Sequence, residues 1–231
     1  MKIQELKVYT PHLTLQRLFY EETLGLEVFN ATNDRFSVKL GESILVFEQR
    51  ETATPYHFAM TIPANKEKEA LTWLKQRVDI LNYEGNTIQE FKNWNAKAIY
   101  FYDADQNIVE FIARNTLNNQ TSDGFSKAQL LEISEIGLPT DAIDQSFIIL
   151  NKTLGLEVYD GNFERFCAVG DANGLIILID KNSRKWFPTN DTAYPSDFSL
   201  IAKVDRSTFR IEYKNEILKA EPITTTSKQN L

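Results

Sequence analysis

The chain has 231 residues, of which 42% are hydrophobic and 12% aromatic, enough for one large or two ordinary domains with buried cores. Its formal net charge is −7 and it has no run of basic residues, so neither nucleic acid nor an anionic membrane surface is an expected partner. The one cysteine, Cys167, excludes an internal disulfide framework. Its apolar neighbours favour a buried strand thiol over a nucleophile. No apolar run reaches the length of a membrane span, and the first residues resemble a strand more than a signal peptide, so we expect a cytoplasmic protein.

The first segment of the chain predicts a strand, a helix and a series of further strands. The strand over 2–9 ends at Thr10-Pro11, where a helix begins, and Gly25 is placed to end that helix. Strand patterns then follow at 26–30, 35–40, 43–49 and 57–62.

The same order then restarts. A helix over 65–78 carries apolar residues at helical spacing, and strands follow near 80–83, 98–102 and 108–113. The last two flank a short polar turn, so they form a hairpin that holds the carboxylate of Glu110 at a fixed height on a sheet face. Burying such a charge is unfavourable unless a metal, a cation or hydrogen bonds compensate it. Glu110 therefore either marks a site or points outward to water.

The second half of the chain repeats the first. Thr23-Leu-Gly-Leu-Glu-Val28 recurs 130 residues later as Thr153-Leu-Gly-Leu-Glu-Val158. The same spacing pairs several single residues, namely Glu5 with Glu135, Thr10 with Thr140, Arg35 with Arg165 and Phe36 with Phe166. Such an internal repeat predicts two like domains in tandem.

The repeat also sets the expected domain limits and fold class. We expect domains over 1–115 and 128–231, joined by a polar, turn-rich linker over 116–127. The predicted class is α+β, with paired β-α-β-β-β units forming cupped mixed sheets. The second domain is truncated at its C-terminal end, because no long helix follows its strand over 197–204 and a counterpart of Glu110 would lie beyond the last residue.

These patterns resemble the vicinal oxygen chelate superfamily of glyoxalase I, fosfomycin and bleomycin resistance proteins and extradiol dioxygenases. The likeness rests on the helix ending Phe19-Tyr20…Leu24-Gly25-Leu26, the strand His57-Phe-Ala-Met-Thr-Ile62 and the hairpin Tyr102–Glu110. The resemblance implies that the paired units form a cupped half-barrel. One departure is Gln106, which stands where relatives usually have a turn glycine.

The resemblance also implies a divalent metal, Zn²⁺, Mn²⁺, Ni²⁺ or Fe²⁺, held by the first, fifth and eighth strands of the cup. At those positions this sequence has Glu5, His57 and Glu110, while Glu48 lies near a further ligand position on the fourth strand. Such a metal would chelate neighbouring oxygens of a small substrate, and Glu110 or Glu48 would move the proton. One imidazole with two carboxylates differs from the two-histidine, one-carboxylate set of iron oxygenases.

A metal-free alternative stays open beside this one. Glu5 and Lys7 lie on the same face of one strand, so the Lys7 ammonium would neutralise a carboxylate of the site and oppose a metal. Taken alone, a histidine such as His57 is more often a hydrogen-bonded structural residue than a ligand. The sequence thus supports a metal-dependent lyase, isomerase or ring-cleaving dioxygenase, or a protein that sequesters a small molecule without metal. A homodimer is compatible with both.

The second half is not expected to build the same site. It keeps Glu135, but Asp197 replaces His57 and Gly137 replaces Lys7. We interpret it as a structural partner or a substrate lid. Trp186-Phe187-Pro188 either closes over a ligand or anchors a packed loop.

Overall fold

The structure is a computed structural model that describes residues 1–223. Its helices are α1 (Leu13–Leu18), continued by a π-helical turn over Phe19–Thr23, α2 (Glu67–Lys75) and α3 (Ile143–Leu154). The strands of the first half are β1 (Lys2–Thr10), β2 (Val28–Phe29), β3 (Arg35–Leu40), β4 (Ser43–Gln49), β5 (His57–Ile62), β6 (Ile80–Leu81), β7 (Gln89–Phe91), β8 (Ala96–Tyr102) and β9 (Ile108–Arg114). Those of the second half are β10 (Glu132–Thr140), β11 (Val158–Asn162), β12 (Phe166–Asp171), β13 (Gly174–Asp180), β14 (Lys185–Trp186), β15 (Asp191–Thr192), β16 (Phe198–Val204), β17 (Ser207–Lys214) and β18 (Ile217–Pro222).

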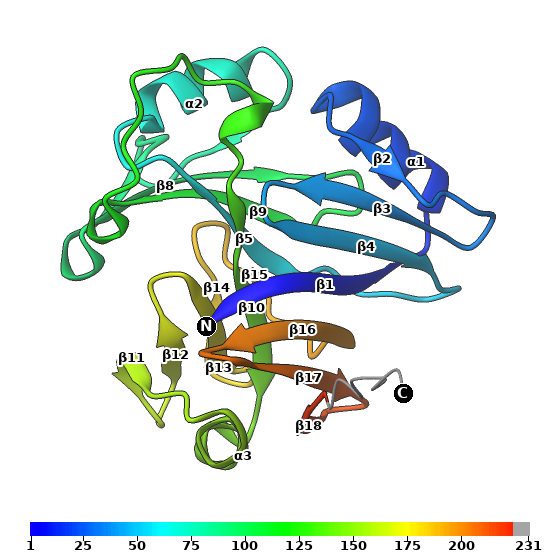
Figure 1. Cartoon of the computed structure of the whole chain (residues 1–231), viewed down its shortest axis with the longest axis vertical. Coiled ribbons are helices and arrows are strands. Elements are labelled where there is room, and N and C mark those ends of the chain that lie inside the picture. The colour runs from blue at the N-terminus through cyan, green and yellow to red at the C-terminus, as the bar shows by residue number, and fades with distance from the viewer. Residues whose placement is uncertain (224–231) are drawn as a thin grey trace, which may run out of the picture.

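Most strands belong to two large mixed sheets. The seven-stranded sheet has the order β18-β17-β16-β1-β4-β3-β2. The nine-stranded sheet has the order β11-β12-β13-β10-β5-β9-β8-β6, with β7 paired to β8. Figure 1 shows β1, near the start of the chain, lying beside β16, near its end. The expected α+β class with cupped mixed sheets is confirmed.

Each sheet takes its strands from both halves of the sequence. β1 pairs antiparallel with β16, and β5 pairs antiparallel with β10. The first β-α-β-β-β unit therefore shares a sheet with the last unit, and the second shares a sheet with the third. The segment between β9 and β10, which holds the predicted linker 116–127, connects two strands of the same sheet. The strand pairing thus does not follow the predicted division into 1–115 and 128–231.

The repeat is real but slips by one residue within β11. Gly25 and Gly155 both follow the helical segment of their unit with positive φ angles of 67° and 72°, a conformation that glycine adopts without steric cost. In the first unit Val28 opposes Val38, so at a spacing of 130 residues Val158 would oppose Ala168. It opposes Val169 instead, because β11 shifts register between Val158 and Asp160.

The slip changes which residues correspond. Arg35 pairs with Glu48 in the first unit, and the residue in the same place of the third unit is Phe166, which pairs with Ile179. The predicted match of Arg35 with Arg165 is therefore wrong by one residue.

The buried hydrophobic residues form two separate clusters. The main hydrophobic cluster draws on both large sheets and on all three helices. Cys167 on β12 is fully buried within it, as expected for a strand thiol. A second cluster, which includes Ala59, Ile112 and Ile177, lies apart from the main core on the nine-stranded sheet. Within residues 1–223, no helix has the length and the apolar character needed to cross a membrane.

Candidate functional site

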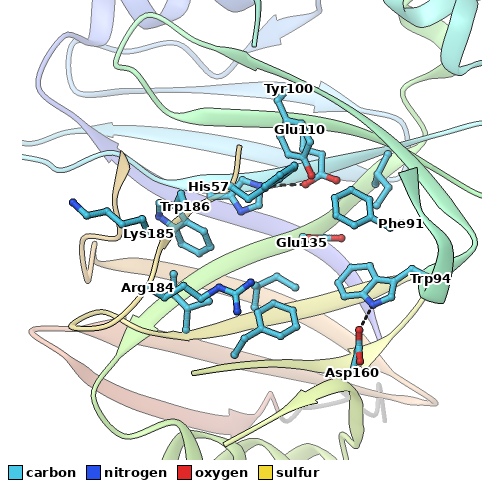
Figure 2. A pocket seen from close by; sticks show the side chains of 15 residues that line it. His57, Phe91, Trp94, Tyr100, Glu110, Glu135, Asp160, Arg184, Lys185 and Trp186 are labelled. Atoms are coloured by element: carbon cyan, nitrogen blue, oxygen red, sulfur yellow. Dashed lines mark hydrogen bonds and ion pairs between the residues drawn. The ribbon is translucent and has the colours of Figure 1, made fainter. Parts of the chain in front are cut away.

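A cavity of about 290 Å³ lies against the nine-stranded sheet. Figure 2 shows its side chains converging from several strands and from the segment around β14. Most of its wall is apolar or aromatic. The lining includes His57, Trp94, Glu110, Glu135, Arg184 and Trp186. A largely aromatic wall with a few polar groups is typical of a small-molecule site.

The polar end of the cavity is a row of residues across four neighbouring strands. Glu135 on β10 opposes Ala59 on β5, which opposes Glu110 on β9, which opposes Tyr100 on β8. Directly opposed residues project from the same face of a sheet, so both carboxylates point to the same side. Because Ala59 is small, it leaves space between them. Burial and the neighbouring Glu110 and Glu135 carboxylates raise the pKa of the Tyr100 phenol well above its usual value.

His57 completes this end of the cavity. It lies two residues before Ala59 on β5, and its Nε2 is 3.1 Å from a carboxylate oxygen of Glu110. Their side chains are only 8% and 3% exposed. Nε2 thus has Glu110 as its hydrogen-bond partner, whereas Nδ1 has no partner among residues 1–223. An unsatisfied buried polar atom costs about 1–3 kcal/mol, so a ligand that donates to Nδ1 would gain by binding here.

Arg114 forms the second buried ionic contact. It follows Glu110 by four residues on β9, so its side chain lies on the same face of the strand. The fully buried guanidinium donates to the carboxylate of Glu135 and, at 3.2 Å, to the hydroxyl of Ser134. Burial and the nearby Glu110 raise the pKa of Glu135 to about 8, against the effect of Arg114.

Gly137 makes room for the aromatic wall. A Cβ atom built on Gly137 would lie 2.5 Å from ring atoms of Trp186. The Trp186 ring therefore packs directly against the backbone of β10, and its centroid is 4.8 Å from that of His57. At 6% exposure Trp186 is a packed anchor and, at the same time, part of the cavity lining. Gly137, which stands at the repeat position of Lys7, thus leaves the space that the Trp186 ring occupies.

Comparisons with known structures identify this architecture. A protein from Bacillus subtilis that carries a dioxygenase name aligns with 96% of this chain and 84% of its own, with a TM-score of 0.62 at 13% identity. A glyoxalase I mutant from Zea mays aligns with 96% of this chain and 92% of its own, with a TM-score of 0.57 at 11% identity. The chain has the glyoxalase/dioxygenase fold. At these identities the likeness shows the fold alone. No family model and no curated protein sequence matches the chain.

The glyoxalase/dioxygenase fold does not bring all the predicted site residues together. His57 and Glu110 meet in the cavity, as their strand positions predict. Glu5 lies on β1 in the other large sheet, where it shares a second, charged pocket with Lys7 and Glu48. The expected convergence of Glu5 with His57 and Glu110 is therefore wrong, because β1 pairs with β4 and β16 and not with β5. Lys7 binds Glu48 at 3.2 Å.

Two predicted correspondences in the second half also change. Glu135, and not Glu5, is the carboxylate that faces His57 and Glu110. Asp197 is also not the counterpart of His57. Ala59 opposes Glu135 on β10, and in the other sheet Ile201 opposes Glu5 on β1. The counterpart of His57, two residues before Ala59, is therefore Ser199. Asp197 instead binds Arg50 at 2.8 Å.

The residues present do not fit a three-ligand metal site of the kind that the fold family implies. A zinc ion needs its ligand atoms about 2.0–2.2 Å from one centre. Within residues 1–223, no group of three or more His, Cys, Asp and Glu side chains is arranged to hold a metal. Glu135, which would be the third ligand beside His57 and Glu110, is bound by the guanidinium of Arg114. A fixed cation at this point also repels a divalent ion.

Sequence reasoning missed Arg114, Trp94 and Arg184. Arg114 had a usable signal, because residues four apart on a strand share a face and Glu110 was already singled out. Trp94 had no such signal, because it belongs to the short 3₁₀ turn Lys92–Trp94, outside any strand. It lines the cavity and donates a hydrogen bond of 2.5 Å to Asp160. Arg184 lies in a loop, where side-chain direction does not follow from periodicity.

Proposed function

We propose that this chain is a small-molecule-binding protein whose cavity in the nine-stranded sheet works without a resident metal. The observation that carries the proposal is the contact of Arg114 with Glu135, which supplies a fixed positive charge where a third metal ligand would be needed. The aromatic wall supplies apolar contact area, and the Glu110 carboxylate supplies hydrogen-bond acceptors at one end. A cavity of about 290 Å³ is at the small end of ligand sites, so it suits a molecule of about one ring with a short substituent.

A metal-dependent lyase, isomerase or ring-cleaving dioxygenase is the second candidate. It is favoured by the contact of His57 with Glu110, two of the three residues that the family resemblance implies as ligands. The two candidates differ in their dependence on a metal ion.

Ligand-observed NMR on chelator-treated protein tests the proposal. The test compounds are small aromatic molecules, and the variant Ile177→Trp fills the cavity from β13. Val46→Trp is the matched control, because Val46 opposes Lys7 in the other sheet just as Ile177 opposes Gly137. We expect wild type and Val46→Trp to bind at least one compound without added metal, and Ile177→Trp to bind none. Binding only after addition of a metal would favour the enzyme instead.

A further inference from the structure

The cavity carries an unequal distribution of charge between its two ends. One end holds the carboxylates of Glu110 and Glu135, of which Glu135 is already bound by Arg114. Toward the other end lies the guanidinium of Arg184, from the loop between β13 and β14. Figure 2 shows this guanidinium pointing toward the middle of the cavity, whereas the neighbouring Lys185 points away from it.

Arg184 has no carboxylate partner within residues 1–223. The ion pairs of arginine side chains there involve Arg17, Arg50 and Arg114. The carbon at the centre of the Arg184 guanidinium instead lies 4.8 Å from the centre of the Phe166 ring, which also lines the cavity. Burial and the neighbouring Arg165 lower the pKa of Arg184, so its charge is not compensated by the protein.

The one other acidic residue of the lining does not fill this role. Asp160 accepts hydrogen bonds from the indole of Trp94 at 2.5 Å and from the backbone of Gly161 at 2.8 Å. An arginine that points into a cavity without a carboxylate is suited to bind an acid group, because its planar donors match the two oxygens of a carboxylate.

We propose, resting on the proposed function, that the cavity takes a flat organic anion, with its acid group on Arg184 and a hydroxyl or amino group at its other end donating to Glu110. Glu110 can accept such a donor because a carboxylate offers about four acceptor positions and His57 takes one of them. The body of the ligand lies between the aromatic rings, of which Trp94 and Trp186 flank the path from one end to the other. The chemical class is therefore a single-ring aromatic acid with a donor opposite the acid.

A set of three compounds separates the two ends of the ligand. They are 3-(4-hydroxyphenyl)propionate, its methyl ester, which lacks the charge, and 3-phenylpropionate, which lacks the hydroxyl. Binding to chelator-treated protein is measured by calorimetry for wild type, Arg184→Gln and Glu110→Gln. Lys152→Gln, which removes the same charge from the exposed end of α3, is the control.

We expect the hydroxy acid to bind wild type most tightly of the three. Arg184→Gln should weaken binding of both acids about tenfold and leave the ester unchanged, since a hydrogen-bonded charge contact contributes about that much. Glu110→Gln should weaken only the two compounds with a hydroxyl. Lys152→Gln should behave as wild type.

Two outcomes overturn the inference in different ways. If the compounds bind in the cavity but Arg184→Gln weakens the ester and the acids equally, the anion assignment is wrong while the proposed function stands. If none of the three compounds binds, or if Ile177→Trp binds them as well as wild type, the inference fails together with the proposed function.

Discussion

Arg114 on β9 and Glu135 on β10 form a fully buried ion pair across the intervening strand β5. The pair joins the second β-α-β-β-β unit to the third, and its Glu135 side chain lines the cavity. It also fixes a positive charge beside the cavity, because the guanidinium lies against two facing carboxyl groups, Glu135 and Glu110. The stability of the sheet junction and the chemistry of the site therefore depend on the same contact.

Removing Arg114 should be costly. At pH 9, where Glu135 is largely ionised in wild type, Arg114→Met leaves its carboxylate buried without a partner, so we expect the free energy of unfolding to fall by about 3–5 kcal/mol. Arg17→Met is the matched control, since the exposed pair of Arg17 with Glu21 at 3.7 Å should contribute less than about 1 kcal/mol. Chemical denaturation measures both. Equal losses in the two variants would contradict the account, as would a double variant Arg114→Met/Glu135→Leu no more stable than Arg114→Met.

The close packing of Trp186 on Gly137 predicts a steric effect. Gly137→Ala places a Cβ atom 2.5 Å from the Trp186 ring, so the ring must move, at a cost of about 1–3 kcal/mol. Gly124→Ala is the control, because a Cβ atom there meets nothing within 4 Å. Thermal unfolding and tryptophan emission of both variants give the comparison. A Gly137→Ala variant with wild-type stability and emission would show that Trp186 does not pack there.

The raised pKa of Glu135 predicts a pH dependence of stability. Its pKa is about 8 in the folded protein and near 4.5 when unfolded, so the folded state binds more protons between these values. This stabilisation is complete below about pH 4.5 and is lost as the pH rises through about 8, with a slope of at most about 1.4 kcal/mol per pH unit. Glu135→Gln should flatten the profile of unfolding free energy over this range. Parallel profiles for wild type and variant would refute the assignment.

Cys167 should be inert in the native protein. Burial on β12 raises the pKa of its thiol to about 11, so the reactive thiolate is scarce at pH 8. A thiol-specific disulfide reagent should therefore label the native protein slowly and the denatured protein at once, with one equivalent incorporated. Rapid labelling of the native protein would place the thiol at the surface and contradict the packing of β12.

Local patterns in the sequence predicted most of the elements but not how the units pair. The β8–β9 hairpin forms around Asp103, whose carboxylate accepts from the backbone N–H groups of Asp105 and Asn107, both at 3.0 Å. Gln106 takes a φ of 63°, a left-handed conformation that glycine adopts without steric cost. Such turn chemistry is local, and the sequence displays it. The strands that pair with β1 are not local to it, since its residue Lys7 opposes Ser199, about 200 residues later in the sequence.

The candidate site was half predicted for the same reason. His57 and Glu110 come from one unit, so their positions on its strands suffice to bring them together. The third carboxylate comes from the neighbouring unit, and choosing Glu135 over its repeat counterpart Glu5 required the pairing of β5 with β10. The short edge strand β18 was not predicted, because its brief alternation resembles a polar tail. The predicted tail over 224–231 lies outside the described residues.

Metal content tests the central claim most directly. Wild type, Arg114→Met and His57→Ala are incubated separately with zinc, manganese, nickel and iron(II), desalted, and analysed by mass spectrometry for bound metal. We predict no stoichiometric metal in wild type, because the Arg114 guanidinium holds Glu135, and a gain of metal in Arg114→Met, where Glu135 is free to join His57 and Glu110. One equivalent of metal in wild type that is lost in His57→Ala would contradict the account and establish the metal-dependent alternative.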